Sequence, residues 1–142
     1  MEVIGLKWES LEEFEAHYHS IIRRTCNIAA PESDALIIGD IACELWSKTR
    51  KLAGRTPTNL SLDCCYLVLR ITGNRVCIAD MEDIALEVVK RPVAVWSFQR
   101  GKVWWKKPRV KAAILEVCGN GNPESILPLY EELDGGWGDE EE

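Results

Sequence analysis

The segment from Leu60 to Ile71 places the strongest constraint on how this chain can fold. Nearly all of its residues are apolar, on whichever side of a helix they would lie. Thr56-Pro57 before it is a typical helix start, and Gly73-Asn74 after it is a typical helix end. A helix that is apolar on all sides is normally buried and packed against several neighbours. We therefore expect this helix to form the centre of a helical domain.

Amphipathic segments on both sides of this central helix predict further helices. Ser10 and Glu13 form a capping-box pattern that starts a helix running to about Cys26. A turn at Ala30-Pro31 leads into a second helix, which we expect to end at Gly54. Three more helices are predicted over residues 80–89, 92–105 and 110–117. The predicted fold is all-α, with a helical domain over residues 8–118 and a flexible acidic tail over residues 119–142.

The six cysteines are expected to be free thiols rather than disulfides or metal ligands. Four of them lie in apolar helical segments, where free cysteine commonly packs as a small hydrophobic residue. No Cys-x-x-Cys pair occurs, and His17 and His19 lie on opposite faces of the first predicted helix. We therefore expect no metal site and no cofactor. Cys64 and Cys65 lie in mid-helix, away from any histidine or helix N-terminus that would activate a nucleophile, so we expect no enzyme.

The apolar runs and the first residues of the chain predict where the protein is located in the cell. No apolar run approaches the roughly 20 residues that a membrane span needs. The first residues do not have the charged, apolar and small-residue order of a secretory leader. We expect an intracellular protein that does not contact a membrane.

The charge is strongly separated along the sequence, although the formal net charge is only −6. Residues 90–111 contain eight basic residues and no acidic one, whereas residues 131–142 contain seven acidic residues and no basic one. The basic segment can attract an anionic partner in spite of the overall acidity. The acidic tail could cover the basic segment, or it could simply increase solubility.

A longer pattern surrounds the central helix. The segment Gly54–Arg70 has a Gly-Arg turn, then a helix that contains Tyr66 and, four residues later, Arg70. This segment resembles the signature of the transcription factor IIB family, which includes archaeal factor B. The similarity extends over roughly residues 10–105, which is one cyclin box of five helices. The sequence departs from the family at Ser61-Leu62-Asp63, where smaller residues are usual, and it has room for one box rather than two. It also has no zinc-ribbon pattern before Leu11.

The resemblance implies a DNA-binding role. In the second box of that family, the last two helices form a helix-turn-helix that reads promoter DNA beside the TATA-binding protein. The matching pair here would be residues 80–89 and the helix from Val93, with the turn between them. The basic residues and one glutamine expected to contact DNA are Lys90, Arg91, Gln99, Arg100, Lys102, Lys106 and Lys107. The expected partners are DNA and a protein of the transcription machinery, such as a TATA-binding protein.

Two alternatives stay open at the level of the sequence. The chain is either a transcription-associated module that contacts promoter DNA, or a cyclin-like protein-interaction module without DNA contact. Trp104 and Trp105 could stack on a base, bind a protein partner, or pack into the core. We name both tryptophans as candidate partner-binding residues.

Overall fold

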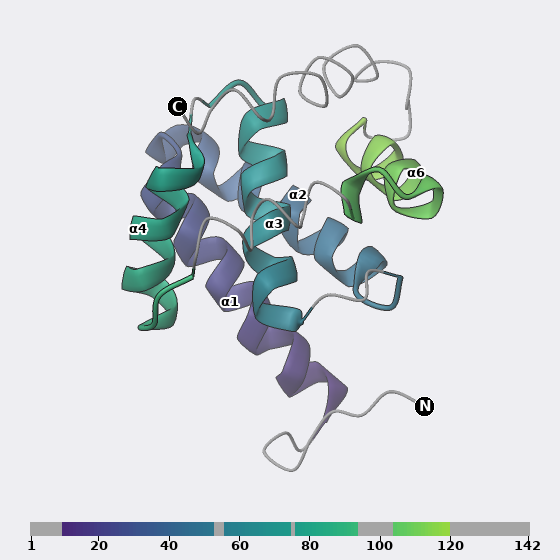
Figure 1. The fold of residues 1–142 in the computed structure, drawn as a ribbon, viewed down its shortest axis with the longest axis horizontal. Coiled ribbons are helices and arrows are strands. Elements are labelled where there is room, and N and C mark those ends of the chain that lie inside the picture. Colours follow the sequence, from purple (N-terminus) through teal and green to yellow (C-terminus); the bar gives the residue numbers. More distant parts are fainter. Residues whose placement is uncertain (1–9, 53–55, 75, 94–103, 120–142) are drawn as a thin grey trace.

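Helices account for all regular structure in the described part of the chain. The computed structural model describes residues 10–52, 56–74, 76–93 and 104–119. Its elements are α1 (Leu11–Ala29), α2 (Glu32–Thr49), α3 (Pro57–Ile71), α4 (Ile78–Val89) and α6 (Pro108–Cys118) (Figure 1). The prediction of an all-α fold is confirmed for these residues, and their helices are consistent with a cyclin-like domain. Most of the helix predicted over residues 92–105, and the tail from residue 120, lie outside the described residues.

Local caps explain where the helices begin. The Ser10 Oγ accepts a hydrogen bond from the Glu13 N–H (3.1 Å), as the capping pattern predicts. The Thr56 Oγ1 accepts one from the Asn59 N–H (3.3 Å) in the same way. By contrast, α4 begins at Ile78 rather than at the predicted Asp80, because the Asp80 carboxylate accepts a hydrogen bond from the Cys77 N–H (3.1 Å). Cysteine is not a usual capping residue, so the pattern does not reveal this start.

The central helix ends in the turn that its glycine predicts. Gly73 has a φ of 94°, which is in the left-handed region that favours glycine. The Asn74 N–H donates to the Leu69 carbonyl (2.9 Å), and the Gly73 N–H donates to the Arg70 carbonyl (3.1 Å). This pair of bonds is the Schellman arrangement, and it satisfies carbonyls that the end of a helix leaves free. The turn redirects the chain from α3 towards α4.

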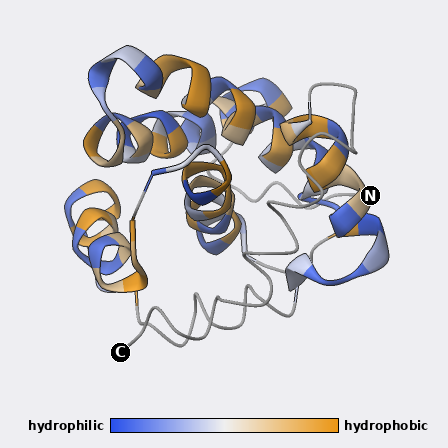
Figure 2. Cartoon of the chain, turned by 90° about the horizontal axis from the view of Figure 1, so that it is seen from above, coloured by the Kyte–Doolittle hydropathy of each residue, from blue (hydrophilic) through white to orange (hydrophobic). Residues whose placement is uncertain are grey.

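The prediction that α3 is the buried centre is confirmed. Its side chains are buried from Leu60 to Leu69, with Tyr66 and Leu67 only 1% and 0% exposed. Helices α1, α2 and α4 contact α3, and α6 packs against α2. Figure 2 looks nearly along α3 and shows the other helices around it. Burial on all sides explains why this segment has no polar face.

The two residues that carry the family resemblance have structural roles. The Tyr66 ring stacks on the Trp105 ring, with 5.8 Å between the ring centroids. The Arg70 guanidinium donates from Nη1 to the Val76 carbonyl (3.1 Å), which joins the end of α3 to the loop before α4. Ser61 is buried, and its hydroxyl donates to the Pro57 carbonyl (2.8 Å) within α3. The hydroxyl of this buried serine therefore has a hydrogen-bond partner inside the helix.

The last helix belongs to the same packed unit as the first four. Lys48 on α2 forms an ion pair with Glu116 on α6 (3.1 Å), and Ile114 of α6 is fully buried. α6 begins at Pro108 rather than at the predicted Val110, since proline suits the first position of a helix. Across the described ranges, no helix has both the length and the apolar character needed to cross a membrane.

Candidate nucleic-acid interface

The described residues of the predicted DNA-binding set lie on two separate elements. Lys90 and Arg91 follow the end of α4, and both are exposed. Lys90 adopts the left-handed conformation (φ 63°), and its N–H donates to the Leu86 carbonyl (3.1 Å). Lys106 and Lys107 are exposed directly before α6. Gln99, Arg100 and Lys102 lie outside the described residues.

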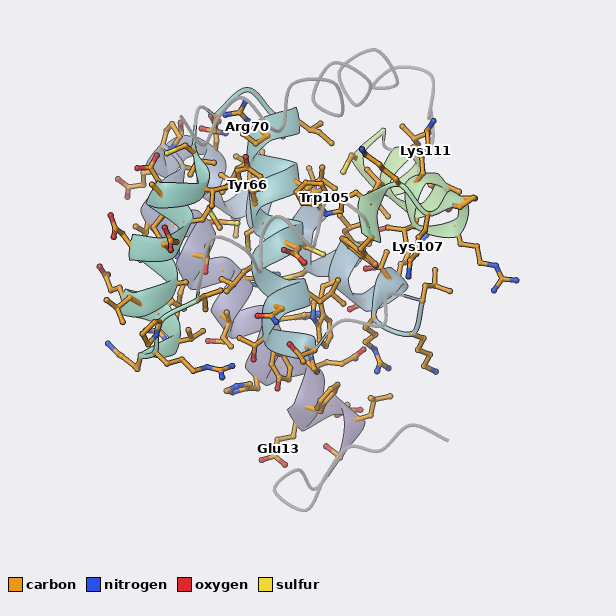
Figure 3. All side chains as sticks on the ribbon, viewed as in Figure 1. Glu13, Tyr66, Arg70, Trp105, Lys107 and Lys111 are labelled. Carbon is orange, nitrogen blue, oxygen red and sulfur yellow. The ribbon has the colours of Figure 1, made fainter. Side chains whose placement is uncertain are left out.

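These two basic groups are on different sides of the molecule. Helices α4 and α6 lie on opposite sides of α3 in the two ribbon views (Figures 1 and 2). Figure 3 shows Lys107 at the start of α6 and Lys111 on the helix, with Tyr66 and Trp105 between α6 and α4. The described residues therefore do not form one continuous basic face from Lys90 to Lys107. The more concentrated group is at α6.

The start of α6 combines basic side chains with the positive end of a helix. Lys107 is the N-cap residue, and Pro108 and Arg109 begin the helix, whose first turn contains no acidic residue. The free N–H groups of a first turn carry partial positive charge, which favours anions. Arg109 is exposed but is absent from the set predicted to bind DNA. Arg109 lies in the segment of residues 90–111, which has eight basic residues and no acidic one, and this charge pattern could have identified it.

Three basic residues elsewhere in the described structure have carboxylate partners, whereas Arg24, Lys51, Lys90 and Arg91 have none among the described residues. Arg23 pairs with Asp40 at 2.7 Å, Lys48 with Glu116 at 3.1 Å, and Arg50 with Glu15 at 3.5 Å. No carboxylate among the described residues lies within ion-pair distance of Lys107 or Arg109. The side chains at the start of α6 therefore keep their charge available to an external anion.

The two tryptophans lie in the core rather than on the surface. Trp104 and Trp105 are 2% and 0% exposed, and the Trp105 ring stacks on Tyr66 of α3. The sequence left open whether these rings stack on a base, bind a partner or pack in the core. The structure places both rings in the core, where they are not accessible to a partner. The Lys107 N–H donates to the Trp104 carbonyl (3.1 Å). The two buried tryptophans therefore act as an anchor that the basic residues directly follow. The anchor fixes the start of α6 against α3.

The cysteines show no sign of nucleophilic activation. All six are free, and Cys26, Cys43, Cys64 and Cys65 are buried. Burial raises the pKa of the Cys64 and Cys65 thiols well above the usual value, and it raises the pKa of Cys43 to about 11. The thiolate is the reactive form, so these groups are inert at neutral pH. No cluster of three potential metal ligands occurs among the described residues.

One contact between α1 and α2 was not expected from the sequence. His19 Nε2 lies 2.9 Å from Ser47 Oγ, and His19 is only partly exposed. Burial lowers the pKa of His19, although the nearby Glu15 acts in the opposite direction. Cys43 Sγ donates to the His19 carbonyl (3.8 Å). His19 on α1 and Ser47 on α2 therefore join the two helices through a polar contact.

Comparison of the chain with protein-family models, with curated proteins and with solved structures found no match. The resemblance to the transcription factor IIB family stays a prediction from the sequence.

Proposed function

We propose that this chain is a transcription-associated, cyclin-box-like module that binds DNA through the start of α6. The observation that carries the proposal is the exposed pair Lys107 and Arg109, which have no carboxylate partner among the described residues. Basic side chains bind DNA by neutralising phosphates and releasing condensed counterions. The dipole of α6 adds partial positive charge at the same place.

The packing next to these residues supports binding with little reorganisation. Trp105 is fully buried against Tyr66, and α6 begins three residues later at Pro108. A binding surface that is already fixed loses less conformational entropy when its partner arrives. The resemblance of residues 10–105 to the transcription factor IIB family supports promoter DNA as the nucleic acid. The same resemblance supports a basal transcription protein, such as a TATA-binding protein, as a neighbouring partner.

The proposal is tested by fluorescence-anisotropy titrations of the full chain with labelled duplex DNA at several salt concentrations. Lys107→Ala and Arg109→Ala should each weaken binding on all DNA sequences to a similar extent, because phosphate contacts carry no sequence information. Each should also reduce the slope of log affinity against log salt by about 0.9 if one phosphate contact is lost. Arg24→Ala is the matched control, since Arg24 is exposed on α1 and has no described ion pair.

Two results would contradict the proposal. One is the absence of measurable binding to duplex DNA at low salt. The other is an equal loss of affinity for Arg24→Ala and Arg109→Ala, which would indicate attraction without a defined surface.

A second candidate function is protein interaction without DNA contact. The observation that favours it is the adjacent pair Leu36 and Ile37 on α2, which are 68% and 62% exposed. Exposed aliphatic side chains that belong to a larger contiguous patch mark surfaces that bind other proteins, and this pair would be the centre of such a patch. Binding through such a surface should change little with salt, and Leu36→Ser with Ile37→Ser should abolish it. This candidate is the better one if a transcription protein binds the chain with weak salt dependence.

A further inference from the structure

A second surface, far from the basic start of α6, lies between the end of α1 and the first turns of α4. A groove there has a volume of about 290 Å³. Its walls come from three elements: the last turn of α1, the loop after α3, and α4. The lining residues are Ile28, Ala29, Val76, Asp80, Asp83 and Ile84.

One side of the groove is lined by aliphatic residues, although polar atoms make up the larger part of its accessible surface. Ile28 is 45% exposed, and Ile84 and Ala29 are partly exposed at the edge of the core. Val76 is buried, and its carbonyl is held by the Arg70 guanidinium (3.1 Å), so the loop at this wall is fixed. An aliphatic side chain placed here would gain about 25 cal/mol for each Å² of apolar surface removed from water.

The other wall of the groove is acidic. α4 contains four carboxylates and no basic residue between Ile78 and Val89. The Asp80 carboxylate is fixed in place by the Cys77 N–H (3.1 Å) and the Cys77 thiol (3.3 Å). Asp83 is exposed, and no basic group among the described residues pairs with it. The wall therefore attracts cations and repels phosphates.

Size and charge together select the class of partner. Pockets for small organic ligands usually have about 300 to 1,000 Å³ and enclose most of the ligand. This groove is at the lower limit and is open to solvent, so it suits one or two side chains of a larger partner. Its carboxylates disfavour the phosphates of nucleic acid. A protein segment with an aliphatic residue between lysines or arginines complements both the aliphatic lining residues and the two carboxylates.

We propose that the α1–α4 groove is a docking site for a basic, amphipathic segment of a partner protein. An aliphatic side chain of that segment enters the space between Ile28 and Ile84. Its lysine or arginine neighbours lie against Asp80 and Asp83. This inference does not depend on DNA binding at α6, because the two surfaces share no residue.

The proposal is tested with a fluorescein-labelled peptide of alternating leucine and lysine blocks, titrated with the full chain. Two peptides of the same length, one of lysine and serine and one of leucine and glutamate, serve as probes of charge alone and of apolar surface alone. The leucine–lysine peptide should bind most tightly. Ile84→Ser should weaken its binding about ten-fold, since a buried apolar contact at the centre of an interface is lost.

Matched variants separate the groove from general acidity. Asp83→Asn should weaken peptide binding about three-fold, the usual scale for one partly exposed ion pair. Asp34→Asn makes the same change on α2, and Leu86→Ser removes an exposed aliphatic side chain from α4 outside the groove. Neither control should alter binding. Because Asp83→Asn leaves the apolar packing intact, the test stands even if Ile84→Ser unfolds the domain.

Three results would overturn the proposal. One is equal binding of the leucine–lysine and lysine–serine peptides, which would indicate charge alone. Another is an equal effect of Asp34→Asn and Asp83→Asn. The third is concentration-dependent dimerisation in sedimentation that Ile84→Ser removes, which would assign the groove to a second copy of this chain.

Discussion

Helices α4 and α6 lie on opposite sides of the same central helix but carry opposite charge. α4 has four carboxylates and no basic residue, whereas α6 and the two residues before it contain four basic residues and one carboxylate. Both helices bury one face, through Met81 and Ala85 on α4 and through Val110 and Ile114 on α6. The difference is therefore confined to their outer surfaces, so the two sides suit different classes of partner.

This comparison explains why the net charge says little about binding. A formal charge of −6 would by itself suggest repulsion of nucleic acid. The Debye length at physiological salt is only about 8 Å, so a ligand responds mainly to the charges near its own site. Helices α4 and α6 lie on opposite sides of the buried helix α3. Each surface can then be tested by variants that leave the other unchanged.

The largest expected effect comes from removing the anchor that joins the α6 side to α3. Trp105→Ala should lower the free energy of unfolding by about 3 to 5 kcal/mol, because the fully buried indole leaves a large cavity beside Tyr66. Chemical denaturation measures this change. Trp105→Phe retains an aromatic ring and should lose less.

A loss below about 1 kcal/mol for Trp105→Ala would show that the start of α6 is not anchored on the central helix, since large-to-small changes in a core cost more than this. Under conditions where the variant stays folded, DNA binding should fall more than binding of the leucine–lysine peptide to the α1–α4 groove. Equal losses at the two surfaces would mean that they do not behave independently.

Sequence alone predicts the existence of α1 to α4 and α6, because each is encoded by residues close together in the chain, although α2 ends at Thr49 rather than at the predicted Gly54. The apolar run of α3, the Ser10 and Thr56 caps and the Gly73 turn are all local signals, and each has its predicted role. The start of α4 differs because Cys77 is not a usual capping residue. Trp104 and Trp105 stayed ambiguous because the basic residues around them suggest a surface, and only packing against α3 resolves their burial.

The candidate surfaces are less predictable because they depend on contacts between distant segments. Lys107 belongs to a basic run that is visible in the sequence, but its lack of a carboxylate partner depends on how α2 and α6 pack. The groove joins Ile28 of α1 to Asp83 and Ile84 of α4, which are far apart in the chain. A pattern within one segment of the sequence cannot predict that these two distant segments lie side by side.

A smaller effect is expected from the acidic end of the chain. If the tail covers the basic start of α6, its five carboxylates over residues 134–142 compete with DNA at a high effective concentration, and deleting these residues removes the competitor. DNA affinity should then rise about five-fold at low salt, and the rise should shrink as salt increases. Peptide affinity at the α1–α4 groove should not rise. A tail of equal length with asparagine and glutamine in place of the acids is the control, and an unchanged DNA affinity for both would exclude competition by the tail.

The smallest expected effect is an unchanged melting temperature when the cysteines are kept reduced. The Cys65 thiol donates to the Ile22 carbonyl of α1 (3.6 Å), and Cys26 of α1 adds to the rise of the Cys65 pKa that burial causes, so Cys26 and Cys65 are the candidate pair for a bridge between α1 and α3. Both are buried as free thiols, and burial raises the pKa of Cys65, which slows oxidation through its thiolate. Adding a reducing agent should therefore leave the melting temperature unchanged. A native disulfide would instead contribute about 2 to 5 kcal/mol, so a fall of several degrees would mean that the chain contains a disulfide, for which Cys26 and Cys65 would be the first pair to test. Both binding surfaces would then depend on a covalent bond as well as on the packing around the central helix.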